Sequence, residues 1–270
     1  MVFTPARQAA IIYMVGFGLS FYWFFPTYSA DLMATWLAGQ FLAAGQPEQV
    51  YPAMTDTFQM YPPSEWRAFM AREYQYEGPI FPFLYPPIWA KLGELLAPVN
   101  FWRLTAVVLV INSTLLIATV HLAYRATKST MHPAIFAALA LFFLFGNHIG
   151  TIALQQNQPQ ILVSFLLVLV VERMRNHAPV FAGVALAIAA AIKIYPVFFA
   201  LFWLFSREKR AFGAFVVAGA LIGATSVIWA GWPLHQVFLD QVRLISGSIL
   251  VTGITFNFDA AIAQLFLNHT

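Results

Sequence analysis

Long runs of apolar residues, separated by short clusters of basic residues, constrain this chain more than any other feature. The runs are about 17 to 25 residues long, which is the length that a helix needs to cross the ~30 Å core of a bilayer. A transmembrane barrel would instead show alternating polarity in segments of about ten residues. The pattern predicts an all-α, polytopic helical membrane protein with about six to eight membrane helices.

The overall composition supports this class. Hydrophobic residues make up 60% of the 270 positions and charged residues only 9%, with a mean hydropathy of +0.72, which a soluble domain of this length would not show. The chain has no cysteine, which excludes disulfides, thiol nucleophiles and thiolate metal sites. The net charge of +3 comes from the loops, so we expect no nucleic-acid partner.

We expect one membrane domain over residues 1–270, with two external segments. Residues 29–100 form a long structured loop with short interfacial helices at 32–44 and 64–76. Residues 232–270 form a second external segment, which ends in a polar stretch and suggests a truncated chain.

The first apolar run could be a cleaved signal peptide, but its length favours a signal anchor. The expected spans are 8–28, 101–124, 133–150, 159–172 and 211–231, the last four within a bundle over 101–231.

Basic residues set the expected orientation, because short loops rich in lysine and arginine stay in the cytoplasm. One choice of topology gathers eight of the fourteen basic residues in such loops and places residues 29–100 outside the cell. We therefore expect a multi-pass protein of the inner (cytoplasmic) membrane, with residues 29–100 facing the periplasm or exterior. The eight residues are Arg7, Arg125, Lys128, Arg173, Arg175, Arg207, Lys209 and Arg210.

Lys193 interrupts the apolar stretch 183–199 and is followed by Tyr195 and Pro196. A lysine at the centre of a membrane helix costs about 2.5–3.5 kcal/mol on insertion scales. The basic clusters on both sides of this stretch should be cytoplasmic, which a single span would not allow. We therefore expect a hairpin of two short helices, 179–192 and 196–206, with Lys193 at its tip on the floor of an outward-facing cleft.

Several polar groups should meet on the outer side, and each has two interpretations. Asp31 either caps the following helix or takes a proton from a substrate hydroxyl as a general base. Lys193 either extends to the interface or neutralises the phosphate of a lipid-linked donor. The amides of residues 155–158 either form a polar loop or bind sugar hydroxyls or phosphate oxygens.

No metal site is expected. The six histidines do not fall at metal-ligand spacing, and the chain has no Asp-x-Asp pair or Gly-rich phosphate loop. We therefore expect no cofactor beyond the donor substrate.

Four pieces of the sequence resemble the GT-C superfamily of polyprenyl-phosphate-sugar-dependent glycosyltransferases, in particular family GT87. Their order and spacing look like the family's over most of residues 25–235, and the last piece is the most specific. The pieces are Ala30-Asp31-Leu32 with Gly45 and Val50-Tyr51, then Phe83 to Ile88, Gln156 to Gln160, and Ala182-Gly183-Val184 through Ala191-Ile192-Lys193-Ile194-Tyr195-Pro196.

The resemblance implies transfer of a mannose-like sugar, with inversion at the anomeric carbon, from a polyprenyl-phosphate donor to a lipid or glycan acceptor. The reaction would take place at the outer face of the cytoplasmic membrane. By position, Asp31 looks like the catalytic base, and Lys193 looks suited to the donor phosphate. The residues expected to bind substrate are Tyr85, Gln156, Asn157, Gln158 and Tyr195.

Two other functions remain open from the sequence. A flippase or transporter of a lipid-linked sugar could use the same broken helix as a phosphate site. Family members usually continue past this length with further spans, so an inactive fragment or a non-catalytic assembly partner is the third interpretation. In every case the expected partners are membrane lipids.

Overall fold

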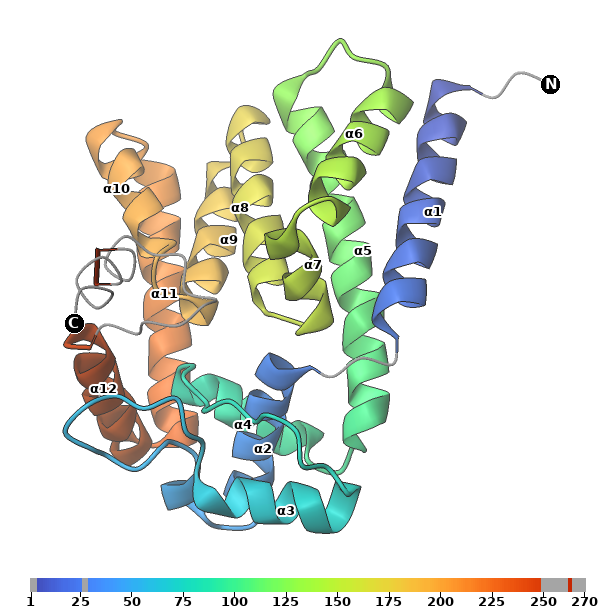
Figure 1. Ribbon diagram of the computed structural model, residues 1–270. Helices are drawn as coiled ribbons and strands as arrows, with labels where there is room; N and C mark the ends of the chain where they lie inside the picture. The colour runs from blue at the N-terminus through green and yellow to red at the C-terminus, as the bar shows by residue number, and fades with distance from the viewer. Residues whose placement is uncertain (1–3, 26–28, 249–261, 264–270) are drawn as a thin grey trace.

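The computed structural model describes residues 4–25, 29–248 and 262–263, and all regular secondary structure in these residues is helical (Figure 1). The expected all-α class is therefore confirmed for the described part of the chain. The helices of the bundle are α1 (Pro5–Phe24), α5 (Phe101–Thr127), α6 (Pro133–Phe145), α7 (His148–Gln155), α8 (Gln160–Arg175), α9 (Pro179–Ile192), α10 (Val197–Phe205) and α11 (Lys209–Ala230). The remaining elements are α2 (Ala30–Ala43), η1 (Pro47–Gln49), α3 (Ser64–Tyr74), α4 (Pro87–Leu96) and α12 (Trp232–Ser246).

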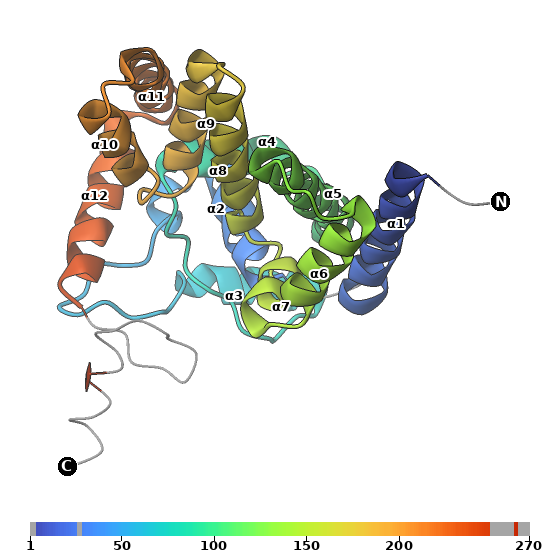
Figure 2. The same ribbon diagram turned by 90° about the horizontal axis from the view of Figure 1, so that it is seen from above.

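The helices form two layers. The bundle helices run roughly parallel to one another, and α2, α3 and α4 lie across their lower ends, with α12 beside them (Figure 1). Seen from above, α1, α5 and α6 lie on one side and α9, α10 and α11 on the other (Figure 2). Helix α8 joins the two sides because it packs against both α5 and α9.

Two of the described helices, α5 and α11, are long and apolar enough to cross a membrane. Helices α6 and α9 are apolar but shorter. Large apolar side chains also cover the outside of the bundle, including Phe142, Phe205 and Ile228, which are 70%, 80% and 84% exposed. Such a surface is suited to lipid contact.

The expected hairpin is present as α9 and α10, with a break at residues 193–196. Proline lacks a backbone N–H, and its ring clashes with the carbonyl four residues earlier in a helix. Pro196 would meet the carbonyl of Ile192 in this way, and Ile192 is the last residue of α9. Lys193 follows in an extended conformation with φ −134° and ψ 142°.

Other boundaries differ from the expectation. The expected span 133–150 is two helices, because α6 ends at Phe145 and the Asn147 side chain starts α7 by accepting a hydrogen bond of 2.7 Å from the Gly150 N–H. Helices α4 and α12 were expected only as irregular external segments. The first helix begins at Pro5, and residues 26–28 of the expected first span lie outside the described residues, as does most of 249–270.

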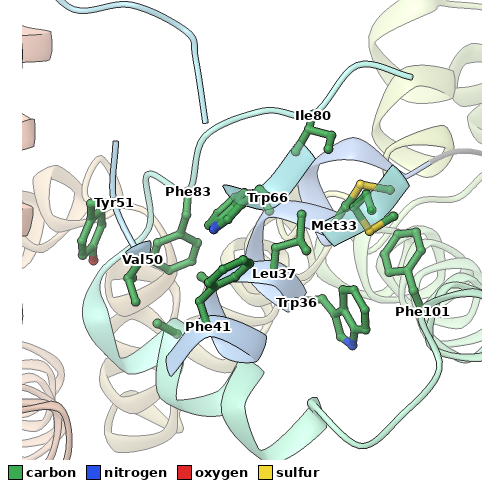
Figure 3. Packing of buried hydrophobic residues seen from close by; sticks show 14 of the residues in the cluster. Met33, Trp36, Leu37, Phe41, Val50, Tyr51, Trp66, Ile80, Phe83 and Phe101 are labelled. Carbon is green, nitrogen blue, oxygen red and sulfur yellow. The ribbon is translucent and has the colours of Figure 1, made fainter. Parts of the chain in front are cut away.

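The expected structured loop has a hydrophobic core of its own. Trp36, Trp66 and Phe83 are at most 2% exposed and pack together with residues of α2, α3 and the start of α5 (Figure 3). The Trp36 ring contacts those of Tyr74 and Phe101, with centroid distances of 5.5 and 5.4 Å. Buried aromatic side chains contribute most per residue to such cores. This core holds α2 rigidly beneath the bundle.

A buried carboxylate ties helices together at the opposite end of the bundle. The Glu172 side chain on α8 is 1% exposed and forms ion pairs with Arg173 and, at 3.2 Å, with Arg125 of α5. Its Oε1 also accepts a hydrogen bond of 2.8 Å from Asn176. These partners compensate the cost of burying the charge.

Candidate functional site

Asp31 lies in the first turn of α2, in the layer beneath the bundle. Burial raises the pKa of its carboxyl above the usual value, while a hydrogen bond from the Gln158 side chain and the charge of Lys193 both lower it. The carboxylate of Asp31 and the ammonium of Lys193 therefore lie close enough to interact electrostatically. The structure brings together two charged residues that are far apart in the sequence.

Lys193 is held at the tip of the hairpin by contacts of the backbone beside it. The indole Nε1 of Trp89 on α4 donates a hydrogen bond of 3.0 Å to the carbonyl of Ala191. The last carbonyls of a helix have no partner within the helix, so Trp89 satisfies one of them and joins α4 to the end of α9. The half-buried Lys193 side chain follows two residues later.

Tyr85 is the third member of this group. Its phenol lies within electrostatic range of Asp31, and burial together with that negative charge raises its pKa, so the phenol remains a neutral hydrogen-bond donor. The Tyr85 carbonyl accepts a hydrogen bond of 2.8 Å from the hydroxyl of the buried Tyr51. Tyr51 thus fixes the backbone of the Tyr85-Pro86-Pro87 segment before α4.

The amides of the α7–α8 turn divide into two kinds. Gln158 reaches the Asp31 carboxylate. Gln156 instead accepts a hydrogen bond from the Ala30 N–H at 2.8 Å, and Asn157 is 2% exposed with its amide bonded to other protein groups. The predicted substrate-binding role of these two residues is untested, and their amides already have protein partners.

Tyr195 lies farther along the hairpin tip. It is 40% exposed, and its hydroxyl accepts a hydrogen bond of 2.9 Å from the Gln160 side chain at the start of α8. The contact joins the start of α8 to the turn between α9 and α10.

Two glycines allow α2 and α4 to approach closely. A Cβ atom added to Gly39 would lie 2.0 Å from the backbone carbon of Gly93, and one added to Gly93 would lie 2.4 Å from the Thr35 carbonyl. Neither position tolerates a side chain without moving a helix. The helix that carries Asp31 is therefore packed directly on the helix that holds the Lys193 tip.

The described residues hold no group of three or more His, Asp or Glu side chains that could bind a metal ion. The sequence-based expectation that no metal is needed is untested. The chemistry available from the described side chains is that of a partly desolvated carboxylate, a cation and neutral donors around them. Such a set can accept a proton and stabilise a developing anion.

The chain matches the model of glycosyltransferase family 87 over residues 83–268, which is more than half of its length. It belongs to glycosyltransferase family 87. The comparisons with curated proteins and with solved structures gave no match. The expected enzyme class is thus confirmed, and membership in this family implies a membrane glycosyltransferase.

The matched region of this family 87 glycosyltransferase contains Tyr85, Gln158 and Lys193, whereas Asp31 precedes it. The link between Asp31 and the matched region is therefore spatial, through its contacts with Gln158 and Lys193.

The supporting contacts of the site in this family 87 glycosyltransferase were not expected from the sequence, although Tyr51 belongs to one of the pieces that carry the family resemblance. Trp89, Tyr51 and the Gly39–Gly93 pair act through long-range contacts. Trp89 lies in an amphipathic segment, and nothing in the sequence around it indicates that its indole bonds to the end of α9. Gly39 and Gly93 lie on two different helices, so their close approach leaves no spacing pattern in the sequence.

Proposed function

We propose that this family 87 glycosyltransferase transfers a mannose-like sugar from a polyprenyl-phosphate donor to a hydroxyl of a lipid or glycan acceptor, with inversion at the anomeric carbon. In this proposal Asp31 is the catalytic base and Lys193 binds the donor phosphate.

One observation carries the proposal: Lys193 at the hairpin tip lies near enough to Asp31 of α2 for its charge to lower the pKa of the Asp31 carboxyl, and Asp31 in turn raises the pKa of Lys193, which burial lowers. A base and a cation on facing elements are what an inverting transfer from a phosphate donor requires. The acceptor hydroxyl needs a base on one side of the anomeric carbon, and the leaving phosphate needs a positive charge on the other.

The proposed step is a single displacement. The acceptor oxygen forms a bond to the anomeric carbon while the bond from that carbon to the phosphate oxygen breaks. The electron pair of the broken bond stays on the polyprenyl phosphate, whose charge Lys193 stabilises. The hydroxyl proton passes to the Asp31 carboxylate, which is the more basic because burial raises its pKa.

Tyr85, Gln158 and Tyr195 are the proposed substrate contacts. Tyr85 offers a neutral phenol next to Asp31, and Gln158 offers an amide beside it. Tyr195 is exposed at the hairpin tip. Hydroxyl and amide groups suit a sugar because each sugar hydroxyl both donates and accepts hydrogen bonds.

We further propose that the bundle spans the inner membrane, with the site facing the periplasm or exterior and with membrane lipids around it. The arrangement supports this orientation because the basic loops α5–α6, α8–α9 and α10–α11 and the start of α1 lie at one end, opposite α2, α3 and α4 (Figure 1). The short-loop basic clusters would then obey the positive-inside rule. Helix α9 has 14 residues and is about 21 Å long, which would place the Lys193 tip short of the far side of a ~30 Å core.

The test uses the full chain in proteoliposomes with a radiolabelled polyprenyl-phosphate mannose and a membrane lipid extract as acceptor. The wild-type protein should form a new glycosidic bond, and Asp31→Asn should lower turnover by about 100- to 10,000-fold while remaining monodisperse. Undiminished turnover by Asp31→Asn would remove Asp31 from the mechanism. If donors carrying other sugars work and the mannose donor does not, the sugar assignment is wrong and the site assignment stands.

A further inference from the structure

We propose that Asn157 and Gln156 are positioning residues, which fasten the first turn of α2 to the α7–α8 turn and so hold Asp31 in place for the reaction. The inference rests on the function proposed above for Asp31. It gives these two residues a task other than substrate binding.

The start of α2 lacks a cap of its own. Its N-cap residue, Ser29, makes no side-chain hydrogen bond to the first backbone N–H groups of the helix. These N–H groups have no partner within the helix. Gln156 supplies one from the α7–α8 turn, because its Oε1 accepts a hydrogen bond of 2.8 Å from the Ala30 N–H, directly before Asp31.

Asn157 joins the same two segments through its side chain. Its Nδ2 donates to the Ser29 Oγ at 2.9 Å and to the Thr105 carbonyl of α5 at 3.3 Å, while its Oδ1 accepts from Asn112 Nδ2 at 3.1 Å. Ser29 Oγ in turn donates to the Gln155 carbonyl at 3.3 Å. The amide of Asn157 is thus engaged by groups of α5 and of the residue before α2, and none of its contacts leads to the Asp31 carboxylate directly.

The backbone of Asn157 explains why an asparagine suits this position. Its φ is 48°, in the left-handed region that asparagine and glycine adopt more readily than other residues. The next residue is Gln158, whose side chain donates to Asp31. Asn157 therefore sets both the direction of the chain into Gln158 and the place of Ser29.

The first experiment separates the backbone from the amide. Asn157→Gly keeps the left-handed conformation without strain and loses the amide, whereas Asn157→Asp keeps an acceptor for Asn112 and loses the donor to Ser29. We expect Asn157→Gly to lower kcat by about 10- to 100-fold with little change in KM for the donor, since a small misplacement of a reacting group costs this much. Asn112→Ala, which removes one supporting bond, should fall between this variant and the wild type.

The same variants should change the pH profile. Gln158 lowers the pKa of Asp31 through its hydrogen bond, so loosening the turn should move the acid limb of kcat to higher pH. For Gln156, Gln156→Glu keeps an acceptor for the Ala30 N–H and should retain more activity than Gln156→Leu. A purely structural role would lower the amount of folded protein and leave the pH limb of the remainder unchanged, and that result would overturn the inference.

A second readout does not depend on catalysis. Because the chain has no cysteine, Asp31→Cys introduces a single thiol at the site, whose alkylation rate reports how firmly the first turn of α2 is held. Adding Asn157→Gly should raise that rate by at least about tenfold if the opening of this turn becomes that much more frequent. Asn147→Ala, which removes the cap of α7 at its other end, is the matched control and should leave the rate unchanged.

Turnover and the alkylation rate together distinguish a failure of the proposed function from a failure of the positioning role. If Asp31→Asn stays active but Asn157→Gly still raises the alkylation rate at position 31, the proposed function fails and the fastening of α2 holds. If Asn157→Gly alters neither the alkylation rate nor the pH limb, the positioning role of Asn157 is wrong, whatever Asp31 does.

Discussion

The indole Nε1 of Trp89 donates a hydrogen bond of 3.0 Å to the carbonyl of Ala191, two residues before Lys193. Through this bond helix α4 determines where the tip of the hairpin lies. Helix α4 in turn packs on α2 at Gly39 and Gly93. The cation and the carboxylate of the candidate site are therefore placed by one short chain of contacts, from Lys193 through α4 to Asp31.

Trp89→Phe should weaken this placement while keeping most of the packing. The variant leaves the Ala191 carbonyl without its donor, which costs about 1–3 kcal/mol if the carbonyl stays buried. We expect a lower unfolding midpoint in detergent and a kcat reduced by about tenfold or more. Trp102→Phe, at an exposed position of α5, is the control and should behave like the wild type. Equal behaviour of the two variants would show that the indole bond does not hold the tip.

The charge of Lys193 should be visible in the pH dependence of transfer. Lys193 lowers the pKa of Asp31, so Lys193→Met should move the acid limb of kcat/KM to higher pH, because the carboxyl then holds its proton until higher pH. The same variant should raise KM for the phosphate donor. Lys193→Arg keeps the charge and should leave the limb close to its wild-type position. The pH profiles of the three proteins decide the matter, and an acid limb that stays in place in Lys193→Met would contradict the interaction.

Asp31→Asn should not weaken the fold. Burial raises the pKa of Asp31 in the folded state, so its contribution favours folding below the unfolded pKa of about 4 and is lost as the pH rises through the folded pKa. At neutral pH the wild-type protein carries the cost of a desolvated carboxylate. The unfolding midpoint of Asp31→Asn at pH 7 should therefore equal or exceed that of the wild type, and the difference should shrink at acid pH. A midpoint clearly below the wild type at pH 7 would instead mark Asp31 as a stabilising residue.

Gly39→Ala should disturb the site by separating α2 from α4. A Cβ at this position would lie 2.0 Å from the backbone of Gly93, so one helix has to move. Overpacking of this kind costs about 1–3 kcal/mol or more. The control is Gly213→Ala on α11, where a Cβ would meet nothing within 4 Å and where alanine is the better helix former by about 1 kcal/mol. Thermal unfolding in detergent should show a loss for Gly39→Ala and no loss for Gly213→Ala.

Glu172→Gln should lower stability at the end of the bundle that lies away from the site. The change removes the charge that Arg125 and Arg173 share, which we expect to lower the free energy of unfolding by about 1–3 kcal/mol. Arg125→Met should cost less, about 0–1 kcal/mol, because the Arg125 side chain is 53% exposed and Arg173 remains. A larger loss for Arg125→Met than for Glu172→Gln would reverse this ranking.

The elements with the strongest local signals could be predicted from the sequence. The hairpin 179–192 and 196–206 agrees with α9 and α10 to within one residue at each end, since Lys193 and Pro196 leave few alternatives. The expected helices 32–44 and 64–76 likewise appear as α2 and α3. Helix α4 was missed because the Pro86-Pro87 pair indicates a turn, although proline is also favoured at the first position of a helix, which Pro87 occupies in α4.

The contacts of the candidate site could be predicted only in part. The meeting of Asp31 and Lys193 was expected from the topology, which places both on the outer side, and from the family resemblance. No periodicity predicts it, since residues so far apart leave no pattern in a single sequence. In the α7–α8 turn, the glutamine and asparagine side chains suggested sugar binding. Residue type cannot distinguish this role from a structural one, because an amide bonds equally well to a sugar hydroxyl and to a backbone N–H. The contacts of Gln156 with the Ala30 N–H and of Asn157 with the Ser29 hydroxyl could be seen only in the structure, and the predicted substrate-binding role of the two residues stays a prediction.

Glu172 and the Gln156–Gln158 turn lie at the two ends of α8, which has 16 residues and is about 24 Å long. With its far end anchored by a buried ion pair, α8 cannot slide along its axis without breaking that pair. The register between the α7–α8 turn and α2 is thus determined partly from the opposite end of the molecule. A mutation of Arg125 or Arg173 would therefore change the position of Asp31 relative to the α7–α8 turn, although neither arginine is among the proposed substrate contacts.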